Sequence, residues 1–228
     1  MSKVVALVTA RSGSKGLPHK NVAVLNGITL LEQAVEVGMK SKLVNEVFIS
    51  TDSKAYEHLA CSAGANSLGL RSDLLSGDEA LSIDVIQDFI KKRNLNENDI
   101  LVLLQPTSPI RNSDQIDMAV ELHIKHFESV TTVALVNEPN PYKLKILSSS
   151  GSLQDFISGS FSEQPRQSLP SVYQLTGAIY VSSVQNIICK NSLYSDKTIP
   201  IIVDEFANID TAIDLEFLKF RCAKGLKW

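Results

Sequence analysis

Short apolar runs alternate with segments of helical periodicity along most of the chain. The first run, residues 3–10, is too short for a helix and breaks into a polar loop with two glycines, which is typical of a buried strand and the turn after it. Thr29 and Glu32 have the spacing of a capping box, and the apolar positions that follow predict a helix over about 29–41. Further strands are predicted at 46–51, 67–70 and 100–105, and further helices at 53–63, 80–92 and 113–126.

This alternation predicts an α/β fold. Parallel strands need crossover connections, and right-handed crossovers place helices on both faces of a mainly parallel sheet. The run at 100–105 is apolar at nearly every position, so we expect it at the centre of that sheet. After an interruption, the pattern resumes with strands at 176–181 and 199–203, a helix at 183–190 and a last helix from about 211.

The interruption spans about residues 138–175. Four prolines punctuate short segments there, and no long amphipathic helix is visible. We interpret this stretch as an insertion or arm that contributes to an oligomer contact. Residues 1–228 are otherwise expected to form a single domain.

The composition of the chain limits the classes of function that are expected for it. The 228 residues carry 22 Lys and Arg against 25 Asp and Glu, a net charge of −3, so a nucleic-acid-binding surface is a poor expectation. The sequence has neither an apolar run long enough to span a membrane nor a cleavable signal pattern, which favours a cytoplasmic protein. Its three cysteines are far apart and are expected to be reduced.

The loop after the first strand has the chemistry of a phosphate site. Arg11, Lys15 and Lys20 supply cations, Ser14 and Asn21 supply hydrogen-bonding groups, and two glycines allow backbone N–H groups to turn toward a ligand. The loop matches neither the Walker A nor the G-x-G-x-x-G pattern. A solvated basic turn remains the alternative interpretation.

Two further polar segments follow predicted strands. The segment 105–111 joins an amide, two hydroxyls and a guanidinium in a turn made rigid by two prolines, which suits either ligand orientation or a plain strand-ending turn with Arg111 paired at the surface. Asp210 precedes the last helix and is a candidate Mg²⁺ ligand, whereas Asp214 has the spacing of a capping residue. His123 and His126 are interpreted as part of a solvated helix face.

Taken together, these motifs resemble the CMP-sialic acid synthetases, also called acylneuraminate cytidylyltransferases. The resemblance covers about residues 3–220 and rests on five segments: 10–21, 104–111, Arg71 with 82–85, 176–180 and 209–211. It implies a Rossmann-like α/β fold with a small dimerisation arm. It also implies transfer of CMP from CTP to the anomeric hydroxyl of a nonulosonic acid, with Mg²⁺ required and pyrophosphate released.

The resemblance further implies residue roles. Arg11 and Lys15 would act on the phosphates and, with Asp210 as the magnesium ligand, would form the catalytic group. The residues implied to bind the nucleotide are Arg11, Ser14, Lys15, Asn21, Arg71 and Ser82. Gln105 and Tyr180 would face the sugar. Lys143 and Arg166 lie in the arm, from which a neighbouring subunit would meet the sugar's carboxylate, so the active unit would be a homodimer.

Two positions depart from the family pattern. Asn208 stands where an aspartate is frequent, which weakens the expected metal site, and Thr176 replaces an asparagine near the sugar, which leaves the identity of the acid open.

Two other functions remain as alternatives to this interpretation. One is a related nucleotidyltransferase acting on Kdo or on a sugar or alditol phosphate, and the other is a nucleotide-binding regulator without turnover.

Overall fold

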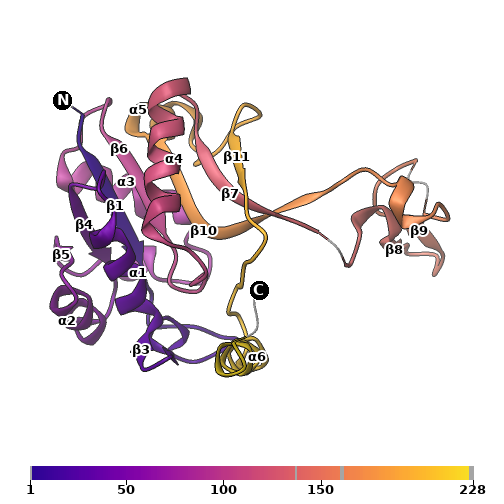
Figure 1. Cartoon of the computed structure of the whole chain (residues 1–228), viewed down its shortest axis with the longest axis horizontal. Coiled ribbons are helices and arrows are strands. Elements are labelled where there is room, and N and C mark those ends of the chain that lie inside the picture. Colours follow the sequence, from indigo (N-terminus) through magenta and orange to yellow (C-terminus); the bar gives the residue numbers. More distant parts are fainter. Residues whose placement is uncertain (1, 137, 160–161, 226–228) are drawn as a thin grey trace.

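A computed structural model describes residues 2–136, 138–159 and 162–225. Within these residues, a seven-stranded sheet has the order β11-β7-β10-β6-β1-β4-β5 (Figure 1). Its strands are β1 (Val4–Thr9), β4 (Glu46–Ser50), β5 (Asn66–Ser67), β6 (Ile100–Leu104), β7 (Val130–Leu135), β10 (Tyr173–Ser183) and β11 (Ile199–Ile202). Within this sheet, β10 is the only described strand that runs antiparallel to its neighbours, β6 and β7. The predicted α/β fold with a mainly parallel sheet is therefore confirmed.

Helices cover both faces of the sheet. They are α1 (Leu30–Lys40), α2 (Lys54–Ser62), α3 (Ser82–Arg93), α4 (Ser113–His126), α5 (Val184–Lys190) and α6 (Ala212–Ala223). Alternate residues of β1 explain the two layers: Ala6 and Val8 pack with α1, α2 and α4, whereas Val5 and Leu7 pack with α3 and α5. α6 packs separately, through Leu215 and Leu218, on the loop region before α1.

Helix starts follow the expected capping chemistry. The Thr29 hydroxyl accepts a hydrogen bond from the Glu32 backbone N–H, and the Thr29 backbone N–H donates to the Glu32 carboxylate, so the predicted capping box of α1 is present. Thr211 and Asp214 form the same arrangement at α6. The expectation for His123 was wrong: it is 3% exposed, and its Nδ1 lies 2.7 Å from the Glu128 carbonyl oxygen, because this end of α4 packs against the sheet.

Smaller elements surround the central sheet. The hairpin β2 (Val24–Leu25) and β3 (Ile28–Thr29) turns at Asn26-Gly27, both with positive φ. Short 3-10 helices occur at η1 (Lys20–Val22) and η2 (Asp73–Leu75). Across the described residues, no helix combines the length and apolarity needed to cross a membrane.

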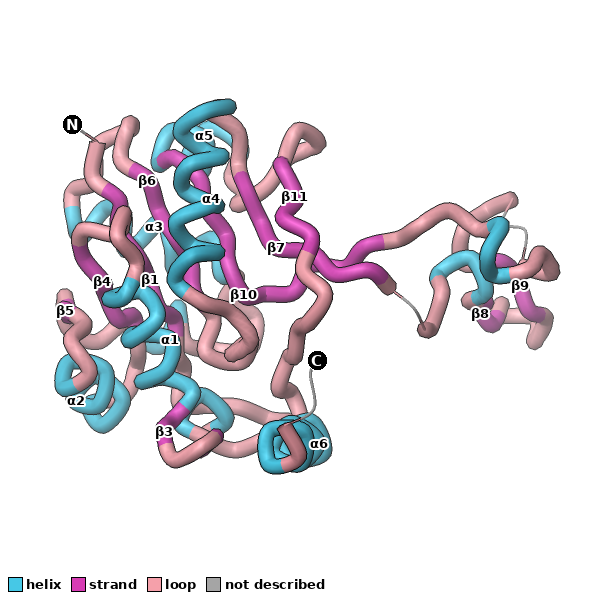
Figure 2. The backbone as a smooth tube through the Cα atoms, viewed as in Figure 1, coloured by secondary structure: helices cyan, strands magenta, loops and turns pink. Residues whose placement is uncertain are grey.

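The segment between β7 and β10 projects away from the sheet. Figure 2 shows these two strands continuing beyond the layered body into an arm. The arm contains a second hairpin, β8 (Lys145–Leu147) with β9 (Leu153–Asp155), and the 3-10 helices η3 (Pro141–Lys143) and η4 (Arg166–Ser168). Its location matches the interruption at 138–175 in the sequence pattern.

Candidate active site

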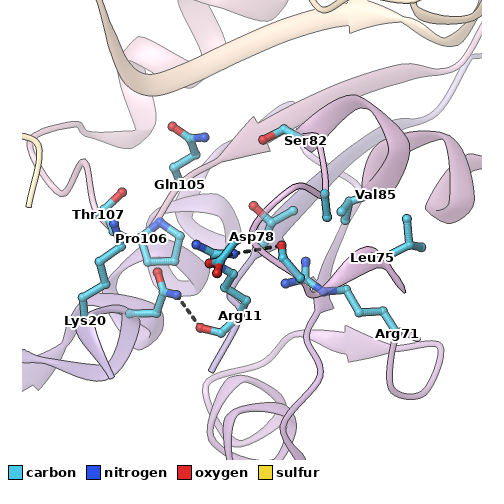
Figure 3. Close-up of a pocket in the computed structure, with 14 residues that line it drawn as sticks. Arg11, Lys20, Arg71, Leu75, Asp78, Ser82, Val85, Gln105, Pro106 and Thr107 are labelled. Carbon is cyan, nitrogen blue, oxygen red and sulfur yellow. Dashed lines mark hydrogen bonds and ion pairs between the residues drawn. The ribbon is translucent and has the colours of Figure 1, made fainter. Parts of the chain in front are cut away.

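A cavity of about 290 Å³ opens where β1 and β6 end. These strands are parallel neighbours, so the loops that follow them lie at one edge of the sheet, where α/β proteins bind ligands. Figure 3 shows Arg11 and Asp78 near the centre of the cavity, with Lys20 and Gln105 on one side and Arg71 and Ser82 on the other. The lining also contains Thr9, Asn21, Leu75, Gly77, Ala80, Val85, Pro106 and Thr107.

The loop after β1 is fixed by an aspartate from the neighbouring strand end. Asp52 follows β4 and accepts hydrogen bonds from the backbone N–H of Ser12 at 2.8 Å and from its hydroxyl at 2.7 Å. Burial alone would raise the pKa of Asp52, but these hydrogen bonds outweigh it and hold the pKa below 3.8. Asn21 adds a second tie by donating from Nδ2 to the Arg11 carbonyl oxygen. The loop is therefore held in one shape before any ligand arrives.

Four cations surround the cavity. Arg11 lines it and forms an ion pair of 3.1 Å with Asp78, and Lys15 reaches the same carboxylate from the rim at 2.6 Å. Lys20 lies opposite and contacts Asp210 at 2.7 Å. Arg71 is 8% exposed, and this burial lowers the pKa of its guanidinium. Such a concentration of positive charge favours a multiply charged anion.

The first turn of α3 also faces the cavity. Ser82 and Val85 both line it, and the N-cap residue Leu81 makes no side-chain capping bond. The free N–H groups and dipole of a helix start favour a negative group. Arg71 fixes the approach to this helix by donating from Nε to the Ser76 hydroxyl at 3.0 Å.

The turn after β6 is closed from inside by Arg111. Its Nη1 donates to the carbonyl oxygens of Gln105 at 2.8 Å, Ser108 at 2.7 Å and Ala178 at 3.2 Å. Desolvation lowers the pKa of Arg111 to about 9, still high enough for the cation to persist at neutral pH. Arg111 thus organises the turn that presents Gln105 and does not form the surface pair considered from the sequence.

Asp210 offers a carboxylate of the kind magnesium prefers. Asp210 Oδ1 accepts from Lys20, and Oδ2 accepts from the Asn208 amide at 2.7 Å. Within the described residues, no group of three or more His, Cys, Asp or Glu side chains is placed to hold a metal ion. Mg²⁺ commonly takes one or two protein carboxylates and completes its shell with water and phosphate, so this donor set fits a metal that arrives with a polyphosphate.

Comparison with known proteins agrees with this chemistry. Residues 5–219 match the family described as cytidylyltransferase. The chain belongs to this family. It is 33% identical over 223 residues to the CMP-N,N'-diacetyllegionaminic acid synthase of Legionella pneumophila, with 93% of both chains covered. These matches confirm the resemblance to the CMP-sialic acid synthetases at the level of the family.

Other relatives are longer. The N-acylneuraminate cytidylyltransferase of Streptococcus agalactiae is 34% identical over 201 residues, which cover 86% of this chain but 47% of that protein. The Escherichia coli protein of the same name is 31% identical, with 95% and 51% covered, so this chain spans about half the length of these relatives. Among solved structures, CMP:2-keto-3-deoxy-manno-octonic acid synthetase in complex with CTP superimposes with a TM-score of 0.72 at 18% identity, over 99% of this chain and 100% of that one. That likeness shows a shared fold.

The cytidylyltransferase brings five residues implied by the resemblance around its cavity: Arg11, Asn21, Arg71, Ser82 and Gln105. Lys15 and Asp210 lie at its edge through ion pairs with lining residues. Ser14 lies in the same loop, and its hydroxyl is shielded from solvent without a hydrogen-bond partner among the described residues. The roles of these residues stay predictions.

Four residues do not line the cavity of this cytidylyltransferase. Tyr180 is 9% exposed in the core with α3 and α5, and burial raises its pKa. Thr176 is buried, and its hydroxyl lies 2.6 Å from that of Thr132 on β7. Lys143 ends η3 and Arg166 begins η4, both in the projecting arm; the Arg166 side chain lies outside the described atoms (Figure 1).

Sequence reasoning missed Asp78, which lies between two implied ligands, Arg71 and Ser82. Its position between these two residues was the only sign in the sequence that Asp78 could lie near the cavity. Only the folded loop shows that its carboxylate reaches the cations after β1. The hydrogen bond from Lys15, followed by the charges of Lys15 and Arg11, lowers the pKa of Asp78.

Proposed function

We propose that this cytidylyltransferase transfers CMP from CTP to the anomeric hydroxyl of a nonulosonic acid and releases pyrophosphate. The observation that carries the proposal is the cationic cavity at the ends of β1 and β6, in a chain of this family. The named activities of the Legionella and Streptococcus relatives support both the nucleotide and the acid class.

The proposed reaction needs alignment and charge neutralisation. The anomeric oxygen forms a bond to the α-phosphorus while the bond from that phosphorus to the bridging oxygen breaks. Pyrophosphate leaves, and the hydroxyl proton passes to water. Arg11 and Lys15 bind the phosphates and offset the charge that develops on the leaving group, which is the main demand of phosphoryl transfer.

The remaining cavity residues orient the two substrates. Asn21, Arg71 and Ser82 bind the nucleotide, and Gln105 faces the sugar from the turn that Arg111 holds. Ser14 contributes its hydroxyl to the phosphates, which would give that shielded group a partner. Precise positioning of this kind accounts for a large part of the barrier reduction in reactions without a covalent intermediate.

Magnesium is proposed as the cofactor, held by Asp210. When bound, it would neutralise charge on the phosphates of CTP. Lys20 would then give up its contact with Asp210 and turn toward the same phosphates. Asn208 contributes an amide oxygen at most, so most of the metal's ligands would come from CTP and water.

The acceptor's carboxylate is proposed to be bound across a homodimer. Lys143 and Arg166 lie on the arm, away from the cavity of their own chain, so they would serve the cavity of a second subunit. Arginine binds a carboxylate through two parallel hydrogen bonds, whereas lysine acts as a single charge. Tyr180, which is 9% exposed, is proposed to face the sugar, as the resemblance implies. We further propose a cytoplasmic location for the enzyme.

The acid itself belongs to the sialic, legionaminic or pseudaminic class. Relatives named for each of these acids are 27–34% identical to the chain. The Kdo synthetase shares the fold at 18% identity, which says nothing about the acceptor. A measured turnover of CTP would distinguish an enzyme from a nucleotide-binding regulator.

The decisive assay combines the protein with CTP, Mg²⁺ and, in separate reactions, N-acetylneuraminic, N,N'-diacetyllegionaminic, pseudaminic and Kdo acids. Pyrophosphate release is the readout. We expect release with at least one nine-carbon acid and little with Kdo. CTP binding without release across the panel would favour the regulator, and preference for Kdo would reassign the acceptor.

A further inference from the structure

Asp78 occupies the space between the two cations that are expected to bind phosphate. One oxygen of its carboxylate lies 3.1 Å from Arg11 Nη1, and the other lies 2.6 Å from Lys15 Nζ. The Gly77 carbonyl oxygen accepts a further hydrogen bond of 2.9 Å from the same Arg11 nitrogen. Three oxygens from one segment, the two of the Asp78 carboxylate and the Gly77 carbonyl oxygen, therefore already contact the phosphate-binding groups.

The contacts of the Asp78 carboxylate with Arg11 and Lys15 resemble those that a bound phosphate would make. A carboxylate and a phosphate both present oxygen acceptors to arginine and lysine. The Asp78 side chain is 45% exposed and that of Lys15 is 82% exposed, so water and solutes reach the ion pair. Exposed ion pairs are weak, and a triply or quadruply charged ligand can replace one.

The segment that carries Asp78 is also held loosely to the body. η2 has no buried residues: its Leu74 is 90% exposed, and Leu81, which follows Asp78 in the chain, is 61% exposed. Its contacts to the site are polar: Arg11 to Gly77 and Asp78, and Arg71 to Ser76. Displacement of Asp78 would therefore expose little apolar surface.

We propose that Asp78 is an internal counter-ion that holds Arg11 and Lys15 while the nucleotide is absent and is displaced by the polyphosphate of CTP. Its return to these cations then competes with pyrophosphate and promotes product release. The proposal rests on the proposed nucleotide site. In this role Asp78 does not bind the nucleotide but competes with it. The residue weakens the binding of every polyphosphate that reaches both cations.

A metal-binding role for Asp78 makes the opposite prediction. If Asp78 held Mg²⁺ against CTP, its neutralisation would weaken binding of the magnesium complex and leave metal-free pyrophosphate unaffected. The counter-ion role predicts tighter binding in both cases. The two roles therefore differ in the sign of one measurement.

The test is calorimetric titration of wild type, Asp78→Asn and Glu79→Gln with CTP and with inorganic pyrophosphate, each with and without Mg²⁺. Glu79→Gln is the matched control, because it removes one exposed negative charge from the next residue, which forms no ion pair within the described part of the chain. We expect Asp78→Asn to bind both ligands about threefold to tenfold more tightly and Glu79→Gln to stay within about twofold of wild type. The difference should shrink in high salt.

Several results would overturn the proposal. Weaker binding by Asp78→Asn in Mg²⁺ would assign it to the metal, and equal changes in both variants would reduce it to general surface charge. Both results would leave the proposed function intact, because CTP would still bind. Failure of wild type and Asp78→Asn to bind either ligand would remove the nucleotide site and the counter-ion role together. Melting curves confirm that each variant is folded.

Discussion

Replacement of Gly16 by alanine should separate two loops of the active site. Gly16 lies in the loop after β1, close to the segment that carries Asp210. A Cβ built on Gly16 would lie 2.5 Å from the Asp210 carbonyl oxygen. The segment before α6 has little freedom to move away, since Ile209 N–H donates to the Thr107 carbonyl oxygen and Asp210 N–H donates to Asp214.

The size of the effect follows from the distance. An ordinary contact begins at 3.4 Å, so the loops must separate by about 0.9 Å. A displacement of about 1 Å at a reacting centre can lower a rate by about 100-fold. That factor corresponds to about 2.7 kcal/mol of transition-state stabilisation. The clash is with a backbone oxygen of a segment held by hydrogen bonds, so the melting temperature should fall as well, and activity is therefore measured well below it.

Gly13→Ala is the matched control for Gly16→Ala. Gly13 lies in the same loop, and a Cβ there would meet no atom within 4 Å. Pyrophosphate release with saturating acid gives kcat and KM for CTP in both variants. We expect a loss of about 100-fold in kcat/KM for Gly16→Ala and less than about threefold for Gly13→Ala. Equal losses, or full activity of Gly16→Ala, would refute the contact between the loops as a requirement for catalysis.

Three other substitutions test separate parts of the account. Lys15→Ala should lower kcat about 100-fold to 1000-fold without changing the melting temperature, because the Lys15 side chain is 82% exposed; full turnover would remove its assigned role. Thr176→Val should lower the free energy of unfolding in urea by about 1–3 kcal/mol, because the buried Thr176 hydroxyl loses its hydrogen bonds with the Thr132 hydroxyl and the Ala178 N–H, with unchanged preference among acids; a changed preference would return Thr176 to the sugar site. Asp52→Asn should be less stable than wild type at pH 7 and lose less stability on acidification. The folded-state pKa of Asp52 lies below its unfolded value of 3.8, so the stabilisation is present above that pH and is lost as the pH falls through the folded pKa; parallel melting curves from pH 7 to about 2.5 would contradict this.

Local patterns predicted most of the layered fold. The helix expected over 29–41 is α1 (Leu30–Lys40), because its capping box and apolar spacing depend on neighbours in the chain. The strand expected at 100–105 is β6 (Ile100–Leu104) at the sheet centre. The antiparallel direction of β10 was not predicted, since strand pairing depends on contacts far apart in sequence. The Asn26-Gly27 hairpin was not predicted either, although this dipeptide is a local signal for a tight turn between two strands.

In the candidate site, too, the sequence could predict the position of some residues and not of others. Arg11 and Gln105 could be placed together because both follow strands that the pattern predicts. The orientation of Thr176 could not be predicted, because the register of β10 against β7 shifts between Leu175 and Tyr180, and such a shift changes which face a side chain occupies. Asp78 reaches Arg11 through a loop whose shape no periodicity describes.

We propose that the cavity after β1 holds the triphosphate of CTP. A crystal structure of the protein in complex with CTP tests it most directly. We expect the phosphates in hydrogen-bonding contact with Arg11 and Lys15, the cytidine toward Asn21 and Arg71, and Asp78 moved off both cations. A triphosphate bound on another face, with the Arg11–Asp78 ion pair intact, would contradict it.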